Sequence, residues 1–327
     1  MRIALLDDWQ GIAEAATDWS ALRREHEVTV FRTGWDSPAA TIAALQGFDV
    51  VMAMRERTWL GREVIEGLPA LRLLTFSGPR NAAVDVSACT ERGIVVCNTV
   101  SNGSSNDTPE LALTLLLAAA RHIPLGDAEI RAGRFQERVP PGIGMFGRTL
   151  GVIGLGRIGG RVAGYAQALG MKVIAWSQNL TEERCAELGV RRVDKATLLA
   201  ESDAVTIHLV LSARSRGLLA AADLALMKRG AILVNTSRGP IVDEAALVAA
   251  LNEGRIRAAL DVFDQEPLPA GHPLRTVPNT VLAPHVGYVT HDNMDMFYAQ
   301  TLENITAWHA GSPIRVVNPE VLQRRPG

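Results

Sequence analysis

A glycine pattern near the middle of the chain restricts the possible folds more than any other feature of the sequence. Residues 150–153 are apolar and lead into Gly154, Gly156 and Gly159, spaced G-x-G-x-x-G, at the start of a helix-compatible stretch at 157–169. A strand that ends in this spacing and precedes a helix is typical of a dinucleotide-binding βα unit. We therefore expect a parallel α/β domain here, with a nicotinamide dinucleotide as cofactor.

The three glycines are expected to have separate roles. Gly154 makes the tight turn, Gly156 lets the backbone approach a pyrophosphate, and Gly159 lets the helix pack closely on the strand. Backbone N–H groups at the helix N-terminus, around Arg157 and Ile158, then favour the phosphates. A tight βα turn in an unrelated α/β protein is the alternative that the motif alone leaves open.

Apolar, strand-like runs recur on both sides of the motif and alternate with helix-compatible stretches. The runs lie at residues 3–6, 28–31, 50–53, 71–76 and 94–96 before the motif, and at 172–175, 204–207, 231–234, 258–261 and 280–282 after it. This alternation predicts an α/β fold with two Rossmann-like, doubly wound parallel sheets. A length of 327 residues suits two domains of ordinary size. Linkers are expected at 98–108, rich in Ser, Asn and Gly, and at the proline-rich 267–278.

Charge and apolar patterning exclude several classes of protein. The net charge is −2 with acids and bases mixed along the chain, so we expect neither nucleic acid nor an anionic membrane as partner. In residues 1–8 two acids follow four apolar residues, which favours a first strand over a signal peptide. We therefore expect a cytoplasmic location. Residues 111–120 are the longest apolar stretch and are too short to cross a bilayer. We expect them to form a buried helix between the domains.

The cysteines give no reason to expect a metal or a disulfide. Cys89, Cys97 and Cys185 are far apart, without C-x-x-C spacing or a nearby histidine cluster. They are expected to be reduced and partly buried, and no metal site is predicted.

Three polar side chains with complementary chemistry lie just past predicted strands. They are Arg238, Glu266 and His285. Open α/β sheets bind ligands at the carboxyl ends of their strands, so the three are expected to meet in one crevice. An arginine that binds carboxylates, a carboxylate and an imidazole are together the working groups of a reductase. Taken singly, each has an ordinary explanation, as a surface ion pair, a solvated turn residue and a histidine bonded to backbone.

On these residues the chain resembles the D-isomer-specific 2-hydroxyacid dehydrogenase family. The resemblance covers nearly the whole chain. It is carried by segments 151–159 (GVIGLGRIG), 234–244 (VNTSRGPIVDE), 261–268 (DVFDQEPL) and 284–287 (PHVG), with further similarity at 68–74 and 92–96. It implies a cofactor domain, residues 101–287, inserted into a flavodoxin-like substrate domain made of residues 1–100 and 288–327. Residues 292–310 fit the family's C-terminal helix.

The resemblance also implies a mechanism. Arg238 would hold a substrate carboxylate and polarise the adjacent carbonyl, while the nicotinamide delivers hydride to the carbonyl carbon. His285 would supply the proton in reduction and accept it in oxidation, and Glu266 would favour its protonated form. The implied substrates are small 2-keto acids, such as glyoxylate or hydroxypyruvate, and the matching D-2-hydroxy acids.

Cofactor choice departs from the usual NAD pattern. An acidic residue normally follows the glycine motif by about 20 positions and binds the ribose, but Ser177, Gln178 and Asn179 stand there. No carboxylate repels a 2′-phosphate, yet no arginine follows immediately. NADP is therefore modestly favoured over NAD, with dual use left open. The other cofactor-binding residues expected from the resemblance are Thr108, His208, Thr236, Ser237 and Asp261, the last equally well explained as a strand-end turn residue.

The predicted substrate loop also departs from the family. Residues 76–81 replace the usual G-x-G-x-D-N pattern, and Ser77, Gly78, Arg80 and Asn81 are the expected substrate contacts. Pro79 removes a backbone donor and Arg80 adds a charge, which points to an unusual substrate.

Two further positions are candidates for the substrate pocket. Arg55 and Arg57 would suit a second acidic group on the substrate, or else form a solvated loop paired through Glu56. Tyr288 either lines the pocket or only packs.

Other functions remain open at this point. The same fold resembles dinucleotide-sensing transcriptional corepressors and phosphite dehydrogenases, and a Rossmann binding protein without chemistry is a further alternative. Formate dehydrogenases characteristically place Gln where Glu266 stands, which counts against them. By analogy with the family we expect a homodimer, with residues 111–120, Ile123 and Pro124 in its interface.

Overall fold

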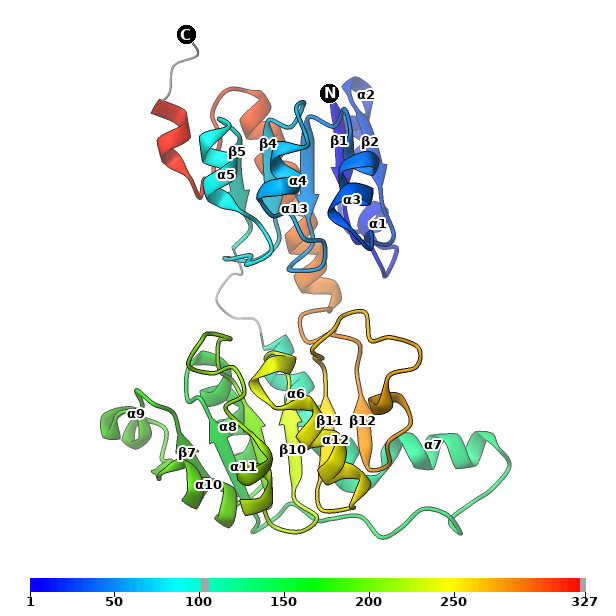
Figure 1. The fold of residues 1–327 in the computed structure, drawn as a ribbon, viewed down its shortest axis with the longest axis vertical. Helices are drawn as coiled ribbons and strands as arrows, with labels where there is room; N and C mark the ends of the chain where they lie inside the picture. The colour runs from blue at the N-terminus through cyan, green and yellow to red at the C-terminus, as the bar shows by residue number, and fades with distance from the viewer. Residues whose placement is uncertain (101–105, 324–327) are drawn as a thin grey trace. The chain divides into compact units, whose positions relative to one another are not determined.

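The computed structural model describes residues 1–100 and 106–323, and these form two compact units (Figure 1). The first unit combines both ends of the chain, residues 1–100 with 289–323, and the second contains residues 106–288. Residues 101–105 of the predicted linker at 98–108, and with them part of the predicted boundary at 100/101, lie outside the described residues.

The first unit is built on a parallel five-stranded sheet of order β2-β1-β3-β4-β5. Its strands are β1 (Arg2–Leu5), β2 (Glu27–Val30), β3 (Val50–Ala53), β4 (Leu73–Phe76) and β5 (Val95–Asn98). Its helices are α1 (Ala13–Ala16), α2 (Ser20–Glu25), α3 (Pro38–Leu45), α4 (Arg62–Glu66), α5 (Val86–Glu91), α13 (His291–His309) and η3 (Pro319–Gln323). The orange helix α13 packs on α1 and β4, so the C-terminal segment completes a unit begun by the blue N-terminal strands (Figure 1).

The second unit is built on a parallel seven-stranded sheet of order β12-β11-β10-β9-β6-β7-β8. Its strands are β6 (Thr149–Ile153), β7 (Lys172–Trp176), β8 (Arg191–Arg192), β9 (Ala204–Ile207), β10 (Ile232–Asn235), β11 (Arg257–Leu260) and β12 (Thr280–Leu282). Its helices are α6 (Asp107–Arg121), α7 (Ile123–Arg131), α8 (Arg157–Ala168), α9 (Glu182–Glu187), α10 (Lys195–Glu201), α11 (Ala221–Leu226), η1 (Gly239–Ile241), α12 (Glu244–Asn252) and η2 (Pro273–Arg275).

Burial on both faces explains why the inner strands of the second sheet are nearly continuous apolar runs. Ile232 and Val234 of β10 pack in the cluster that contains residues of α6 and α8, whereas Leu233 between them packs with residues of α10, α11 and α12. Successive side chains of a strand point to opposite faces, so a strand covered on both sides has no polar alternation. The predicted fold class, two doubly wound parallel sheets, is confirmed.

Two elements differ from the sequence-based expectation. Strand β8 was not expected, because Arg191 and Arg192 are both exposed at the edge of the sheet and offer no apolar run. Helix α6 starts four residues before the predicted 111–120 stretch and packs against α8, β10 and β11 within the second unit.

The described residues allow two further statements. Cys89, Cys97 and Cys185 are free and buried, and burial raises the pKa of the first two thiols to about 12. Among residues 1–100 and 106–323, no single helix is long and apolar enough to span a membrane, although α6 and α7, bent by 62°, reach that length together.

Candidate active site

The turn from β6 to α8 requires its glycines for different physical reasons. Gly154 has a φ of +97°, a conformation that L side chains rarely adopt, and its amide donates to the Trp176 carbonyl at 2.9 Å. A Cβ atom on Gly159 would lie 2.0 Å from the Gly154 carbonyl oxygen, so helix α8 approaches the turn as closely as it does only because the residue is glycine. A Cβ on Gly156 would meet nothing within 4 Å, so its face of the turn is open.

A pocket of about 440 Å³ opens beside this turn. Gly154, Leu155 and Gly156 of the turn line it with Ser177 and Asn179. The other lining residues lie at the start of α9 and past the end of β9, namely Leu180, Thr181, Arg184, His208, Leu209 and Val210. None of these described lining residues carries a carboxylate. Arg184 was not singled out from the sequence, because it lies seven residues past Ser177 and only the fold of α9 brings it to the pocket.

The residues present fit a dinucleotide. The Nδ1 atom of His208 and the hydroxyl of Thr236 are buried and have no hydrogen-bond partner among the described residues. Buried polar atoms are rarely left unpaired in a native structure unless a ligand or water supplies the partner. The unpaired nitrogen of His208, which lines the pocket beside the glycine turn, is therefore an atom for which a bound dinucleotide would supply the partner.

Asn235 organises the turn that carries Arg238. Its side-chain amide donates to the Arg238 carbonyl at 2.9 Å, and its oxygen accepts the Ser237 amide at 3.0 Å. Ser237 in turn donates its hydroxyl to the Ile207 carbonyl at 2.7 Å, and Arg238 Nη1 donates to the Ser237 carbonyl at 2.7 Å. Asn235 was not predicted as a site residue from the sequence, although a polar residue at the end of an apolar strand is a signal that could have identified it.

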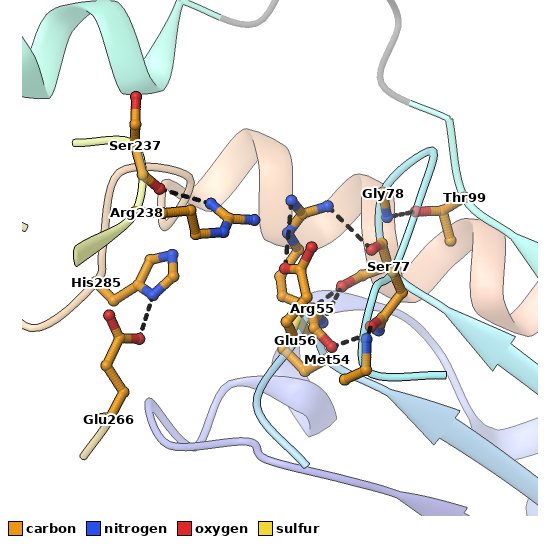
Figure 2. A network of polar contacts seen from close by, with 12 residues as sticks. Met54, Arg55, Glu56, Ser77, Gly78, Thr99, Ser237, Arg238, Glu266 and His285 are labelled. Atoms are coloured by element: carbon orange, nitrogen blue, oxygen red, sulfur yellow. Dashed lines mark hydrogen bonds and ion pairs between the residues drawn. The ribbon is translucent and has the colours of Figure 1, made fainter. Parts of the chain in front are cut away.

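Glu266 and His285 form a close pair in the second unit (Figure 2). His285 Nδ1 lies 2.5 Å from Glu266 Oε2, and Glu266 Oε1 accepts the Phe263 amide at 2.9 Å. Burial acts to raise the pKa of Glu266, but the hydrogen bond and positive charge of His285 outweigh it and lower that pKa below its ordinary value. His285 has a φ of +55°, which is uncommon for a residue with a side chain.

Asp261 holds the backbone on the far side of His285. Its carboxylate accepts the amides of Val286 at 2.8 Å and Gly287 at 2.9 Å. The carboxylate is buried, and burial raises its pKa against these two hydrogen bonds. Thr108 donates its hydroxyl to the Gly287 carbonyl at 3.0 Å, so Asp261 and Thr108 both secure the loop that carries His285.

The remaining predicted residues of the second unit take less central places. Arg157 and Ile158 begin α8, and Gln178 is exposed and is not among the residues that line the pocket. The Tyr288 ring lies edge-on to His285, with ring centroids 6.1 Å apart.

The predicted substrate loop of the first unit is tied together by Ser77 (Figure 2). The Ser77 hydroxyl accepts the Arg55 amide at 2.8 Å, and its carbonyl accepts Arg55 Nη1 at 3.2 Å. Asn81 donates to the Arg55 carbonyl at 2.5 Å. Gly78 has a φ of +87°, and its amide donates to Thr99 Oγ1 at 2.8 Å, a partner that the sequence did not suggest.

Charged residues surround this loop. Arg55 lies 3.7 Å from the Glu56 carboxylate, and Arg57 acts to lower the pKa of buried Asp7, which burial raises. Arg80 is exposed. The structure thus groups Arg55, Ser77, Gly78 and Asn81 in the first unit, and Arg238, Glu266 and His285 lie at strand ends of the second.

Comparison with known proteins gives one family. The model of the NAD binding domain of the D-isomer specific 2-hydroxyacid dehydrogenases matches residues 113–287. A glyoxylate reductase from Korarchaeum cryptofilum is 40% identical over 270 residues, covering 81% of each chain. A D-3-phosphoglycerate dehydrogenase from Archaeoglobus fulgidus is 36% identical over 308 residues, covering 93% of this chain and 57% of that enzyme. The chain thus spans only part of the length of this phosphoglycerate dehydrogenase.

A solved structure agrees over almost the full length. A phosphoglycerate oxidoreductase from Vibrio cholerae superposes with a TM-score of 0.89 at 32% identity, covering 95% of this chain and 99% of that one.

Proposed function

Because the chain belongs to the D-isomer-specific 2-hydroxyacid dehydrogenase family and carries its NAD-binding domain, we propose that it transfers a hydride between NAD(P)H and a small 2-keto acid. The product of that reduction is the D-2-hydroxy acid. The observation that carries this proposal is the 2.5 Å contact between His285 and Glu266 in the unit that holds the glycine turn. An imidazole bonded to a carboxylate beside a nucleotide site is suited to proton transfer near neutral pH.

Each of the three polar residues has a defined task in this proposal. The guanidinium of Arg238, whose turn Asn235 secures, binds the substrate carboxylate and polarises the neighbouring carbonyl. A bound nicotinamide supplies the hydride for the carbonyl carbon. His285, which uses Nδ1 for Glu266, delivers the proton to the carbonyl oxygen from Nε2. In oxidation the proton returns to Nε2.

Glu266 supports His285 in this scheme. The hydrogen bond and charge of His285 lower the pKa of Glu266, so Glu266 remains a charged acceptor for Nδ1 of that ring. Reduction of a keto acid consumes one proton, which His285 supplies in this scheme.

The first test is the rate of NADPH and NADH oxidation across a panel of 2-keto acids. We expect turnover on at least one acid, and a kcat lower by about 100-fold or more for His285→Ala, the scale of a lost general acid. The matched control is His291→Ala, a histidine that begins α13 in the other unit. Tight dinucleotide binding without turnover on any acid would instead favour a dinucleotide-sensing scaffold or another hydride donor.

The pocket supports a preference for NADPH over NADH. Ser177 stands where NAD-specific sites carry an acid, and it lines the pocket together with Asn179 and Arg184. Arg184 reaches the turn, since its Nε donates to the Leu155 carbonyl at 3.3 Å. Its Nη1 also pairs with the exposed carboxylate of Glu187 at 2.9 Å, a residue that does not line the pocket. A guanidinium has further donors besides that one, and with no carboxylate among the described lining residues it suits a 2′-phosphate.

Arg184→Ala tests this preference. We expect KM for NADPH to rise about tenfold, the scale of one charge-assisted contact, while KM for NADH changes little. Arg191→Ala is the control, because Arg191 is an exposed arginine paired with Glu201 and does not line the pocket. An equal change for both cofactors would contradict a role for Arg184 in recognising the 2′-phosphate.

Substrate contacts are proposed for the first unit as well. Ser77, Gly78 and Asn81 form a turn that is hydrogen-bonded to Arg55. Arg80 of the same turn is an exposed cation. Guanidinium groups on a loop at the carboxyl ends of β3 and β4 suit an acidic substrate. In the second unit, Tyr288, whose ring lies edge-on to His285, is proposed to line the substrate site beside that histidine.

We also propose a homodimer. Helix α7 and the segment after it expose Ile123, Leu125, Ile130 and Phe135 by 59%, 39%, 56% and 67%. Ile123 and Ile130 are seven residues apart and therefore lie on one face of α7. Apolar side chains gathered on one exposed element are typical of an interface with another protein surface.

A further inference from the structure

A second histidine–carboxylate pair connects helix α12 to the loop that carries Glu266. Glu244 is the first residue of α12, just after the segment that carries Arg238, and His272 lies six residues past Glu266. His272 Nε2 is 2.9 Å from Glu244 Oε1, and their side chains are 17% and 22% exposed. The pair is thus largely enclosed, and the proposed reaction does not use it.

The backbone determines which nitrogen of His272 carries the proton. The amide of Leu274 donates to His272 Nδ1 at 3.2 Å, so Nδ1 acts as an acceptor. In that tautomer Nε2 carries the hydrogen and donates it to Glu244. His272 therefore connects one end of the loop to α12 in a defined orientation.

The other oxygen of Glu244 holds the opposite end of the loop. Its Oε2 accepts the Asp264 amide at 3.4 Å. The preceding amide, that of Phe263, donates to Glu266 itself. Glu244 thus bonds to the amide that directly follows the Phe263 amide, which orients the Glu266 carboxylate.

Close packing leaves this turn little freedom. A Cβ on Gly239 would lie 2.2 Å from the Phe263 carbonyl carbon, so the turn after Arg238 lies against the turn before Glu266. Further along, Arg275 Nε donates to the Pro269 carbonyl at 2.7 Å and the His272 amide donates to the same carbonyl at 3.0 Å. The loop closes on itself, and Glu244 bonds to both of its ends.

We infer that Glu244 and His272 are positioning residues. They hold the turn at 263–266 against α12 and thereby determine the position of the Glu266 carboxylate in its hydrogen bond with His285. This inference rests on the proposed function, since it concerns the groups that move the proton there. Without Glu244, the amide of Asp264 and the Nε2–H of His272 both lose their acceptor. Glu266 would then hold its contact with His285 for a smaller fraction of the time.

The test compares Glu244→Ala, Glu266→Gln and the double variant in the full-length protein. Two quantities are measured: the midpoint of the high-pH fall in kcat for keto-acid reduction, and the midpoint of the His285 ring titration by NMR. The resonance is assigned by its absence in His285→Ala. We expect Glu244→Ala to move both midpoints to lower pH, as Glu266→Gln does but less far. At pH values above the midpoint, kcat of Glu244→Ala should be lower than that of the wild-type protein by about tenfold. The double variant should move no further than Glu266→Gln alone.

Conservative variants and a control separate positioning from general destabilisation. Glu244→Gln and His272→Gln each keep one hydrogen-bonding group, so their midpoints should lie close to those of the wild-type protein. If Glu244→Ala does not fold, His272→Ala carries the test instead, because it removes the contact from the other side and should move both midpoints to lower pH, by less than Glu266→Gln. Glu253→Ala, an exposed carboxylate just past α12, should leave both midpoints unchanged.

Unchanged midpoints in Glu244→Ala, even with a lower Tm, would overturn the inference, as would additive shifts in the double variant. Failure of the proposed function would look different. The wild-type protein would then reduce no 2-keto acid, while the NMR titration of His285 would still decide whether Glu244 acts on the Glu266–His285 pair.

Discussion

His208 combines a buried polar atom with a strongly shifted ionisation. Its Nε2 pairs with Thr206 Oγ1 at 2.9 Å, while Nδ1 is buried without a partner among the described residues. Burial lowers the pKa of His208 to about 3, so the ring is neutral near pH 7. A neutral ring with one unpaired nitrogen at the edge of the dinucleotide pocket is suited to a hydrogen bond with the ligand and costs stability in its absence.

This shift makes stability depend on pH. The pKa of His208 in the folded protein, about 3, is below the value of about 6.5 in an unfolded chain. The unfolded state therefore binds the proton first, and stability falls as pH drops below about 6.5 towards the folded-state value. At pH 5 the free energy of unfolding is lower than at neutral pH by at most about 2 kcal/mol, because each pH unit below about 6.5 contributes about 1.4 kcal/mol.

His208→Gln should reduce this dependence. Urea unfolding at pH 7 and pH 5 measures it, and the difference between the two free energies of unfolding should be smaller in the variant. His309→Gln, at the exposed end of α13, serves as the control. The same pH difference in His208→Gln and the wild-type protein would show that this ring is not protonated on unfolding.

The turn between β6 and α8 shows how one motif serves two purposes. Gly159 is required by the protein itself, because a Cβ there would lie 2.0 Å from the Gly154 carbonyl oxygen. Gly156 is not, because a Cβ there would meet nothing within 4 Å. A glycine with open space around it in this turn is best explained by the close approach of a ligand.

Alanine at each position should separate the two purposes. Gly159→Ala is expected to lower the free energy of unfolding by about 1–3 kcal/mol, the usual cost of overpacking. Gly156→Ala should leave Tm nearly unchanged but raise the dissociation constant for NADPH by about tenfold or more, because the methyl group occupies the path of the pyrophosphate. Thermal unfolding and a dinucleotide titration measure the two effects. Equal losses of Tm would contradict this division of roles.

The exposed apolar side chains of α7 relate to the association state of the chain. If they form the proposed interface, Ile130→Glu should convert the dimer into monomers in sedimentation equilibrium, because a charge would be buried without a partner. Leu226→Glu is the matched control, since Leu226 is 46% exposed at the end of α11. A wild-type protein that stays monomeric at micromolar concentration would refute the dimer itself.

Most elements of the fold were predictable from apolar runs. Strands β3, β9 and β12 coincide with their predicted ranges, and α8 ends one residue before its predicted end. Parallel strands covered on both faces leave a strong pattern in the sequence, because nearly every position is apolar. The two-residue strand β8 left none, since edge pairing involves only its backbone and its arginine side chains stay exposed.

The sequence alone determined the α/β class, the glycine turn and the chemical groups that follow the strand ends, because these depend on periodicity and residue type over short distances. Which partner each polar group takes depends instead on how distant segments fold onto one another. Asp261 bonds to backbone amides 25 and 26 residues away, and Glu244 reaches His272 across 28 residues. Such pairs depend on strand order and loop closure, and the spacing of residues along the chain carries no record of them.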